Sequence, residues 1–433
     1  MELLPPHVRR ADLPQARTPR RAFGTGAGVV LSAILDHGPV ARSTVARLTG
    51  LSPAAVSGYC AQFLARGLIR ESAETAGPRG LGRPHKPVEI DTDRYLVAGA
   101  HVAVAHSTVS LMDLRGRIVA EDRQPHEDTA PHAVLGSLAA RLPRMVAERA
   151  AGRTVLAFGL ATGQWVDPGS GVVVDHPRLG WRDVPARELL TAATGLPVHV
   201  DSHSRALARA EQLFGDAGSR GDSTVLLFVG AVVDAAFVSA GAVHRGPRSG
   251  AGSVAHLPLG PHGPLDARLG QDPDGFEGPP VGAPAADACS CGTTGCLQSE
   301  VSEAAMVLRA RQLGVRVDDF VDLLDLALAG DDRAVGLFRR RARLVGRATA
   351  LLLDVFDPDV LVVVEPGAAR LPECLADMRA EVAVRSWVCD DPERTVVTSS
   401  FTGSVLPTAG GAVALGALYA DPLGPWPALP AVS

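Results

Sequence analysis

The sequence lacks any apolar run long enough to cross a membrane. No stretch of about 18 residues or more is free of both charges and helix breakers, so no transmembrane helix is predicted. The first 23 residues contain five arginines and no apolar core segment, which excludes a secretory signal peptide. We therefore expect a cytoplasmic protein without a membrane partner.

Cysteine and lysine are both scarce. The chain has six cysteines, and Cys60, Cys374 and Cys389 stand apart in apolar surroundings, which excludes a disulfide framework. Lys86 is the only lysine, so nearly all positive charge comes from arginine. This bias indicates a GC-rich genome rather than a particular chemistry.

Charge is distributed unevenly along the chain. The net charge is -5, yet residues 1–90 contain 12 Lys and Arg against 6 Asp and Glu, a net of +6. A basic N-terminal part on an acidic body favours a small module that meets a polyanion. A solvated basic tail is the alternative explanation of the charge alone.

The chain of 433 residues is too long for one ordinary core, so two or three domains are expected. Residues 1–24 are rich in Pro and Arg and predict a flexible tail. Next, apolar residues at helical spacing predict helices over 29–37, 43–48 and 53–66, and two short strands follow at 68–70 and 87–90.

This order of elements predicts a winged helix-turn-helix over residues 25–92. Small residues at the start of the third helix, among them Ser52 and Ser57, would let it enter a major groove. Ser52 is also expected to cap that helix. Arg42 on the second helix suits phosphate oxygens.

The loop between the two strands adds a second contact with DNA. Arg83 is held extended by Pro84, which suits insertion into a minor groove, and Lys86 adds a charge nearby. Double-stranded DNA is therefore the expected partner. The alternative is an all-helical protein-docking module with a hairpin.

Three of the cysteines, Cys289, Cys291 and Cys296, lie within eight residues in the pattern CxCGxxGC. Soft thiolates this close together, with glycines that let the backbone wrap, suit a tetrahedral zinc site. His256 is the candidate for the fourth ligand. Four protein ligands leave no position for a catalytic water, so the zinc would be structural. An unmetallated, reduced cluster is the alternative.

From residue 93 onward the pattern changes to two successive units, each with a strand meander followed by helices. Two such units predict a duplicated α/β architecture with a cleft between two lobes, without giving the strand order. Strands are predicted over 95–104, 107–113, 117–120, 155–161, 198–200, 224–229, 234–239 and 360–364, and helices over 133–150, 205–214, 301–313, 317–329, 331–356 and 410–419.

Taken together, the chain resembles the ROK family (repressors, open reading frames and sugar kinases) over about residues 25–421. Family members bind one zinc through a His in a Gly-Glu-x-Gly-His segment and three cysteines, and here the segment reads Gly-Ser-Val-Ala-His over 252–256. The resemblance thus implies His256, Cys289, Cys291 and Cys296 as zinc ligands. Between them, residues 260–288 are expected to form a surface loop.

For residues 93–433 the resemblance implies a two-lobed, actin-like and ribonuclease H-like sugar-kinase fold that serves effector binding and dimerisation. A homodimer or homotetramer is the family expectation. Residues 163–181, from Gly-Gln-Trp-Val-Asp-Pro to Leu-Gly-Trp, resemble the family's loop near the sugar.

The catalytic motifs of the family's kinases do not match. Asp-x-Gly-x-Thr is replaced by His-Val-Ala-Val-Ala over 101–105, the second phosphate loop reads Gly-Ala-Val-Val-Asp over 230–234, and Val-Glu-Pro-Gly over 364–367 replaces a glycine pair. Ser202 and His203 replace the catalytic Asn-Asp pair. Phosphoryl transfer needs backbone amides around the phosphates and a carboxylate base, so no kinase activity is expected.

The family's sugar-contacting acids correspond to Ser253 and Gln298, which with Ser202, His203 and His256 are the candidate effector-binding residues. Ser and Gln bind hydroxyls more weakly than carboxylates do, so the cleft either binds a small effector or is vestigial. The resemblance implies a transcriptional regulator that binds an operator and represses carbohydrate-related genes in response to a sugar-derived effector. The alternatives are a constitutive DNA-binding factor and an active ROK sugar kinase.

Overall fold

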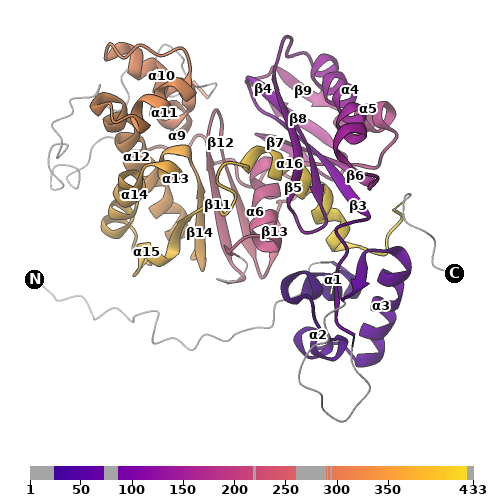
Figure 1. The fold of residues 1–433 in the computed structure, drawn as a ribbon. Helices are drawn as coiled ribbons and strands as arrows, with labels where there is room; N and C mark the ends of the chain where they lie inside the picture. Colours follow the sequence, from indigo (N-terminus) through magenta and orange to yellow (C-terminus); the bar gives the residue numbers. More distant parts are fainter. Residues whose placement is uncertain are drawn as a thin grey trace, which may run out of the picture.

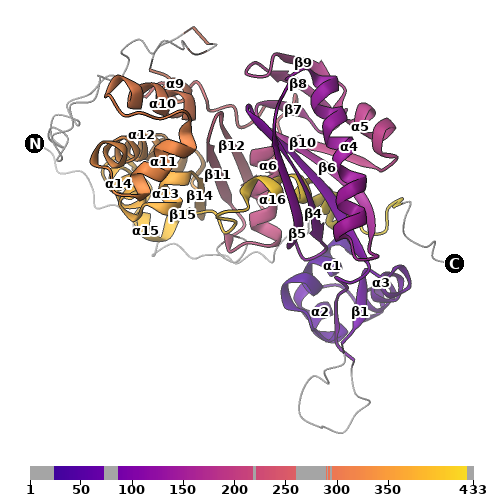
Figure 2. The same ribbon diagram turned by 45° about the horizontal axis from the view of Figure 1, so that its top comes forward.

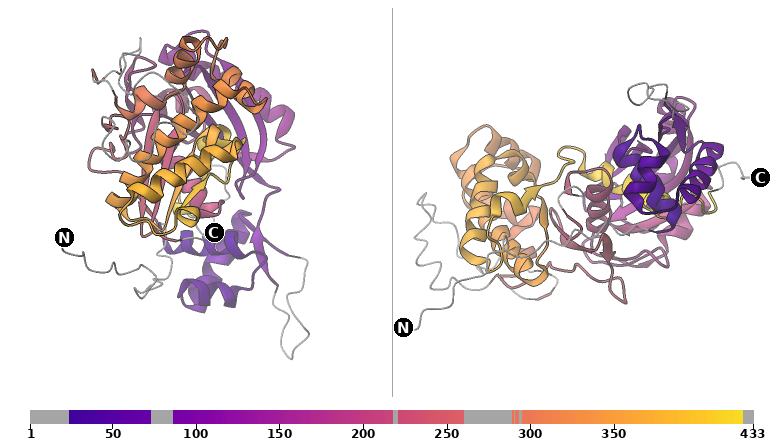
Figure 3. Two further views of the ribbon diagram at one scale, coloured as in Figure 1. Left: turned by 90° about the vertical axis from the view of Figure 1, so that its left-hand side faces the viewer. Right: turned by 90° about the horizontal axis from the view of Figure 1, so that it is seen from below.

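The computed structural model describes residues 24–72, 86–217, 221–259, 289, 291–292 and 295–426. A small helical domain lies beneath one lobe of a two-lobed body, and the view from below places it away from the helices of the other lobe (Figures 1 and 3). Within the described ranges, no helix combines the length and the apolar character needed to cross a membrane.

The helical domain has the predicted element order. Ser52 caps helix α3, since its Oγ accepts a hydrogen bond of 3.2 Å from the backbone N of Ala55, as expected. Strands β1 and β2 pair antiparallel, with Ile69 opposite Ile90. Arg83, which is predicted to enter the minor groove, lies outside the described residues, as does the expected loop 260–288. The elements are α1 (Gly26–His37), α2 (Arg42–Thr49), α3 (Pro53–Arg66), β1 (Ile69–Glu71) and β2 (Val88–Ile90).

The first lobe is built on a five-stranded sheet in the order β10-β6-β3-β4-β5. Helices α4 and α5 cover its outer face (Figure 2). Its elements are β3 (Tyr95–Val102), β4 (His106–Asp113), β5 (Ile118–Pro125), α4 (Pro131–Arg149), β6 (Thr154–Thr162), α5 (Ala186–Thr194) and β10 (Val198–Ser202). The next helix, α6 (His203–Leu213), packs mainly against the sheet of the second lobe.

The second lobe repeats this topology in the order β13-β12-β11-β14-β15. In both sheets an antiparallel meander of three strands continues into two parallel strands, which confirms the duplicated actin-like architecture. The strands are β11 (Thr224–Val229), β12 (Val233–Ser239), β13 (Ala242–His244), β14 (Val360–Val364) and β15 (Val396–Thr398), and the helices are α9 (Leu297–Val301), α10 (Glu303–Gln312), α11 (Phe320–Leu328), α12 (Asp332–Phe356), α13 (Pro366–Arg370), α14 (Pro372–Arg385) and α15 (Pro392–Thr395).

The segment expected to be a loop near the sugar instead contains a third sheet. It consists of β7 (Trp165–Asp167), β8 (Val172–His176) and β9 (Trp181–Val184), paired antiparallel in that order. Strands of three to five residues are too short for alternation of apolar residues to reveal them. Trp181 is buried, and its indole N–H donates to the carbonyl of Thr129 at 2.7 Å.

Helix α16 (Val405–Ala420) lies between the lobes and starts five residues before the predicted position. Glycines bring it into backbone contact with lobe 1, because a Cβ at Gly99 would lie 2.2 Å from the N of Gly411. At its other end, the carbonyl of Ala420 accepts a 3.0 Å hydrogen bond from the backbone N of Thr25, the cap of α1.

One hydrophobic core continues from the helical domain into the body. Val30 and Ile34 of α1 belong to the same buried cluster as Leu415 and Leu418 of α16. The Arg66 guanidinium, at the end of α3, adds hydrogen bonds to two carbonyls just after α16. Helix α16 therefore connects the helical domain directly to the contact region of the two lobes.

Candidate functional site

The outward face of α3 is small and open. Val56 and Phe63 are buried in the domain core, whereas Ser52, Ser57 and Gly58 are exposed. A Cβ added at Gly58 would meet no atom within 4 Å. The start of the helix can therefore approach another surface closely.

Arg42 and Lys86, two cations that were predicted to contact DNA, both pair with the carboxylate of Glu71. Arg42 Nη2 lies 3.3 Å from Glu71 Oε1, and Lys86 Nζ lies 3.2 Å from Glu71 Oε2. Glu71, at the end of β1, was missed in the sequence because its two partners are distant along the chain. Exposed ion pairs contribute little stability, so phosphate groups can replace the carboxylate.

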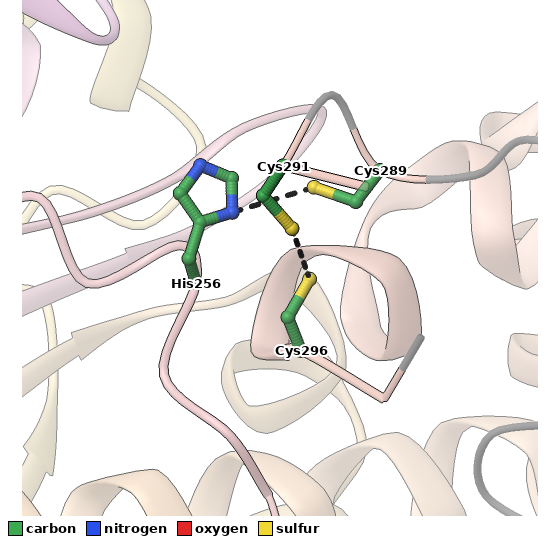
Figure 4. A group of neighbouring side chains, drawn as sticks. All are labelled: His256, Cys289, Cys291 and Cys296. Carbon is green, nitrogen blue, oxygen red and sulfur yellow. Dashed lines mark hydrogen bonds between the residues drawn. The ribbon is translucent and has the colours of Figure 1, made fainter. Parts of the chain in front are cut away.

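The four predicted zinc ligands converge (Figure 4). All four ligand atoms lie within 4.8 Å of one another. His256 Nδ1 is 3.4 Å from Cys289 Sγ, and the sulfurs of Cys291 and Cys296 are 3.9 Å apart. Zinc bonds of about 2.3 Å to sulfur and about 2.0–2.1 Å to nitrogen place tetrahedral ligand atoms about 3.5–3.8 Å apart. The side chains therefore fit one zinc ion.

Backbone hydrogen bonds hold the two ligand segments together. Cys296 is buried at the start of α9, where the backbone N of Leu297 donates to the carbonyl of Leu257 at 2.9 Å. Burial, together with the nearby thiols of Cys291 and Cys296, raises the pKa of Cys289 to about 11. The thiol of Cys289 therefore stays protonated unless a cation replaces its proton, which is the donor chemistry of a metal site.

A cavity of about 940 Å³ adjoins the zinc ligands and lies between the lobes. Of the five candidate effector residues, Ser202, Ser253 and His256 line it. His203 and Gln298 are not among its lining residues. Trp165, from the segment that resembles the family's loop near the sugar, contributes to the wall, as does Arg182, which the sequence did not single out.

His203 is instead enclosed in a network between the lobes. Its ring is 1 % exposed, with Nδ1 3.2 Å from His101 Nε2 and Nε2 3.1 Å from Asp234 Oδ2. Asp234 also accepts a hydrogen bond of 2.8 Å from the backbone N of Gln164. Burial, and next the proximity of His203, lowers the pKa of His101 well below its ordinary value, so that imidazole is neutral.

The side chain of Gln298 binds the loop between β11 and β12. Its Oε1 accepts from the backbone N of Val233 at 2.8 Å, and its Nε2 donates to the carbonyl of Ala231 at 2.9 Å. Val232 packs towards lobe 1, where a Cβ at Gly163 would lie 2.6 Å from its Cγ2. A loop whose amide is already bound and whose valine fills the space offers no cradle for phosphates.

Three features define the class of protein: the two repeated sheets, the helical domain with its two-stranded wing, and the cluster of one histidine and three cysteines. They are those of a regulator built on a sugar-kinase-like body. The chain belongs to the ROK family, whose sequence profile matches residues 97–418. It is 34% identical over 414 residues to the transcriptional regulator Rv0485 of Mycobacterium tuberculosis, covering 92% of this chain and 87% of that protein.

Two further comparisons extend the likeness. The N-acetylglucosamine repressor of Escherichia coli O157:H7 is 25% identical over 344 residues, covering 76% of this chain and 77% of the repressor. The crystal structure of a ROK family transcriptional regulator, a homolog of the E. coli MLC protein, superposes with a TM-score of 0.72 at 22% identity. That superposition covers 91% of this chain and 96% of the other, so the fold is shared over nearly the whole length.

Proposed function

We propose that this protein is a DNA-binding transcriptional regulator that represses carbohydrate-related genes in the cytoplasm, and that it is not a sugar kinase. The observation that carries this proposal is the combination of a winged helix-turn-helix, whose helix α3 has an open N-terminal half, with a kinase-like body. One hydrophobic core joins the two parts. In the body, the loop between β11 and β12, which would hold phosphates in a kinase, is bound by Gln298 and filled by Val232. Relatives named as a transcriptional regulator and a repressor support the same role.

In this proposal residues 25–92 bind the operator, through Ser52 and Ser57 in the major groove and through Arg42, Arg83 and Lys86 along the wing and backbone. Residues 93–433 bind the effector and dimerise, since two-fold operators require two winged helices at a fixed spacing.

The cleft is proposed to bind a sugar-derived effector. Ser202, Ser253 and His256 offer polar groups to hydroxyls, and the indole of Trp165, 39 % exposed, offers an apolar face. The indole N–H donates to the carbonyl of Arg248 at 2.7 Å, which holds the ring in place. Because Trp165 belongs to lobe 1 and Arg248 follows β13 in lobe 2, a ligand here would change how the lobes meet.

Zinc bound by His256, Cys289, Cys291 and Cys296 is proposed to be structural. With four protein ligands it has no position for a reacting water. It would join the segment that carries His256 to the start of α9, and so support the wall of the cleft.

Gly58→Glu tests DNA binding. The added side chain has open space on α3, so the fold should persist, but its carboxylate would face DNA phosphates. We expect at least about a tenfold loss of affinity for DNA from the gene's own upstream region, measured by fluorescence anisotropy at low salt. Gly136→Glu is the matched control, because Gly136 is also an exposed helical glycine with no atom within 4 Å. Equal affinities of the two variants would contradict the assignment of α3 as the DNA-contacting helix.

Glu71→Gln tests the wing. Neutralising this carboxylate leaves Arg42 and Lys86 free to meet phosphates and removes a repulsive charge. We expect DNA affinity to rise by a few fold. The slope of log affinity against log salt concentration should also steepen, by about the amount that one phosphate contact contributes. Glu148→Gln, an exposed change on α4, should leave both quantities unchanged. A loss of affinity in Glu71→Gln would show that the carboxylate orders the wing rather than competing with DNA.

A further inference from the structure

Three positions at which this chain departs from the family's kinase motifs meet in one hydrogen-bonded chain. His101 stands where the first phosphate motif has its Asp, His203 replaces the catalytic Asp, and Asp234 ends the altered second phosphate loop. His203 contacts the other two, through Nδ1 to His101 Nε2 at 3.2 Å and through Nε2 to Asp234 Oδ2 at 3.1 Å. The three residues therefore form one unit that spans both lobes, with His101 on β3 and Asp234 on β12.

Asp234 is the member of this unit that reaches the effector cleft. It lines the cleft, whereas His101 and His203 do not, and its side chain is 9 % exposed. Its Oδ2 accepts two hydrogen bonds, from His203 and from the backbone N of Gln164. Its Oδ1 accepts none from the described part of the chain, and it is not shut off from solvent. Oδ1 is therefore an accessible acceptor at the wall of the cleft.

The other carboxylate of the described cleft wall is placed differently. Asp175 has a side chain that is 36 % exposed, and it pairs with Arg182 at 3.7 Å. The acids that contact sugars in the family correspond here to Ser253 and Gln298, which carry no charge. Asp234 thus gives the cleft a buried carboxylate from an element that does not carry the family's acids.

The backbone places this acceptor beside the aromatic face of the cleft. Gln164, which donates to Asp234 at 2.8 Å, immediately precedes Trp165 in the chain. Gln164 has a φ of 66°, in the left-handed region that residues other than glycine rarely occupy, so its surroundings must hold this conformation. A sugar ring combines apolar C–H faces with hydroxyl donors at its edge, and an indole next to a carboxylate matches both.

We propose that Asp234 Oδ1 accepts a hydrogen bond from a hydroxyl group of a neutral sugar whose ring lies against Trp165, which rests on the sugar-binding role proposed for the cleft. A hydroxyl that donates to a carboxylate makes a charge-assisted hydrogen bond, about twice as strong as a neutral one. A carboxylate or phosphoryl group in the same place would be repelled by Asp234. Asp234 is thus the residue that selects a hydroxyl over an acidic group at this point of the cleft.

The same carboxylate connects the cleft to the DNA-binding domain. Its partner His203 begins α6, and Ala206 of that helix belongs to the same buried cluster as Ala409 of α16. Helix α16 ends at the carbonyl that accepts the hydrogen bond from Thr25 at the start of α1. A hydroxyl on Asp234 competes for the charge that holds His203, so ligand binding would weaken the contact between the lobes at the start of α6.

Isothermal titration of the full-length protein with glucose, mannose and galactose tests the role of Asp234. We expect at least one of the three to bind, with one sugar per chain, and its affinity to fall by about tenfold or more in Asp234→Asn. The amide oxygen of that variant can still accept from Gln164 and His203, whereas its NH2 group cannot accept a hydroxyl proton. Asp234→Glu keeps the charge but moves it by one methylene, so it should show the same loss and serves if Asp234→Asn does not fold.

Asp175→Asn is the matched control, because it neutralises the other carboxylate of the wall. Its exposed ion pair contributes little, so affinity for the sugar should change by about twofold or less. Single-deoxy analogues of the bound sugar then identify the hydroxyl. One analogue should bind wild-type protein about tenfold more weakly than the sugar does, and should lose nothing further in Asp234→Asn, where its partner is already missing.

The role of Asp234 is overturned if Asp234→Asn and Asp234→Glu bind the sugar as wild-type protein does, or if only Asp175→Asn weakens binding. It is also overturned if every deoxy analogue loses as much affinity in Asp234→Asn as in wild-type protein. If none of the three sugars binds, it fails together with the sugar-binding role proposed for the cleft. DNA binding by α3 is judged separately, by the comparison of Gly58→Glu with Gly136→Glu.

Discussion

Cys296→Ser is expected to release the zinc ion and to lower the unfolding temperature of lobe 2 markedly. Cys296 is the most buried of the four ligands, at 2 % exposure, and it begins α9. Structural zinc contributes on the order of 10 kcal/mol to small zinc-finger peptides. We expect part of that free energy to be lost here, because Leu297 and Val301 still hold α9 in the core of lobe 2.

The effect should extend beyond the metal. Gln298 follows directly in α9 and binds the loop at Ala231 and Val233, while His256 lines the effector cleft. Loosening the start of α9 would therefore free the loop between β11 and β12 and one wall of the cleft. Hydrogen exchange at Val233 is expected to accelerate in the variant.

The measurements are zinc content by atomic emission and thermal unfolding with and without a chelator. Cys389→Ser is the matched control, since Cys389 is a part-buried thiol outside the cluster and should leave both values unchanged. The zinc proposal fails if purified wild-type protein contains no metal, or if Cys296→Ser retains stoichiometric zinc with an unchanged midpoint.

Local signals explain which parts of the fold could be predicted. Ser52 at the start of α3 and the spacing of the cysteines act over a few residues, and the structure has α3 and the cluster where the sequence places them. The strand order could not be predicted, because it depends on which distant strands pair. The short strands β7 to β9 were missed for lack of periodicity.

The candidate site was predicted only in part, for the same reason. The resemblance to the family correctly indicated that Ser202, Ser253 and His256 line the cleft. It failed to show that His203 would turn to His101 and Asp234, because those partners come from other strands.

A second large effect is expected from Arg341→Met, in the centre of lobe 2. The Arg341 side chain is fully buried, and its Nη1 lies 2.7 Å from Oε1 of Glu365, which is 1 % exposed. Its other nitrogens donate to the carbonyls of Val301 and Val229, at 2.8 and 3.2 Å. The guanidinium also lies 4.9 Å from the ring centroid of Phe320.

Removing Arg341 would leave Glu365 charged and unpaired in the core. Breaking a buried pair from one side costs about 3–5 kcal/mol, so we expect a loss of that order in the free energy of unfolding, measured by urea denaturation. Arg343→Met is the control, because Asp377 stays paired with Arg339 at 2.9 Å when Arg343 is removed, so the loss of stability should be smaller than in Arg341→Met.

The double variant Arg341→Met with Glu365→Met separates the charge effect from packing. If the cost comes from the unpaired carboxylate, removing it as well should recover most of the lost stability. If packing of the arginine stem dominates, the double variant should be at least as unstable as Arg341→Met. Recovery would also bear on the proposal that this protein is not a sugar kinase. Glu365 stands where the family's kinases carry a glycine pair, at the shared carboxyl end of the parallel strands β11 and β14. In this chain a buried ion pair occupies that end of the sheet instead.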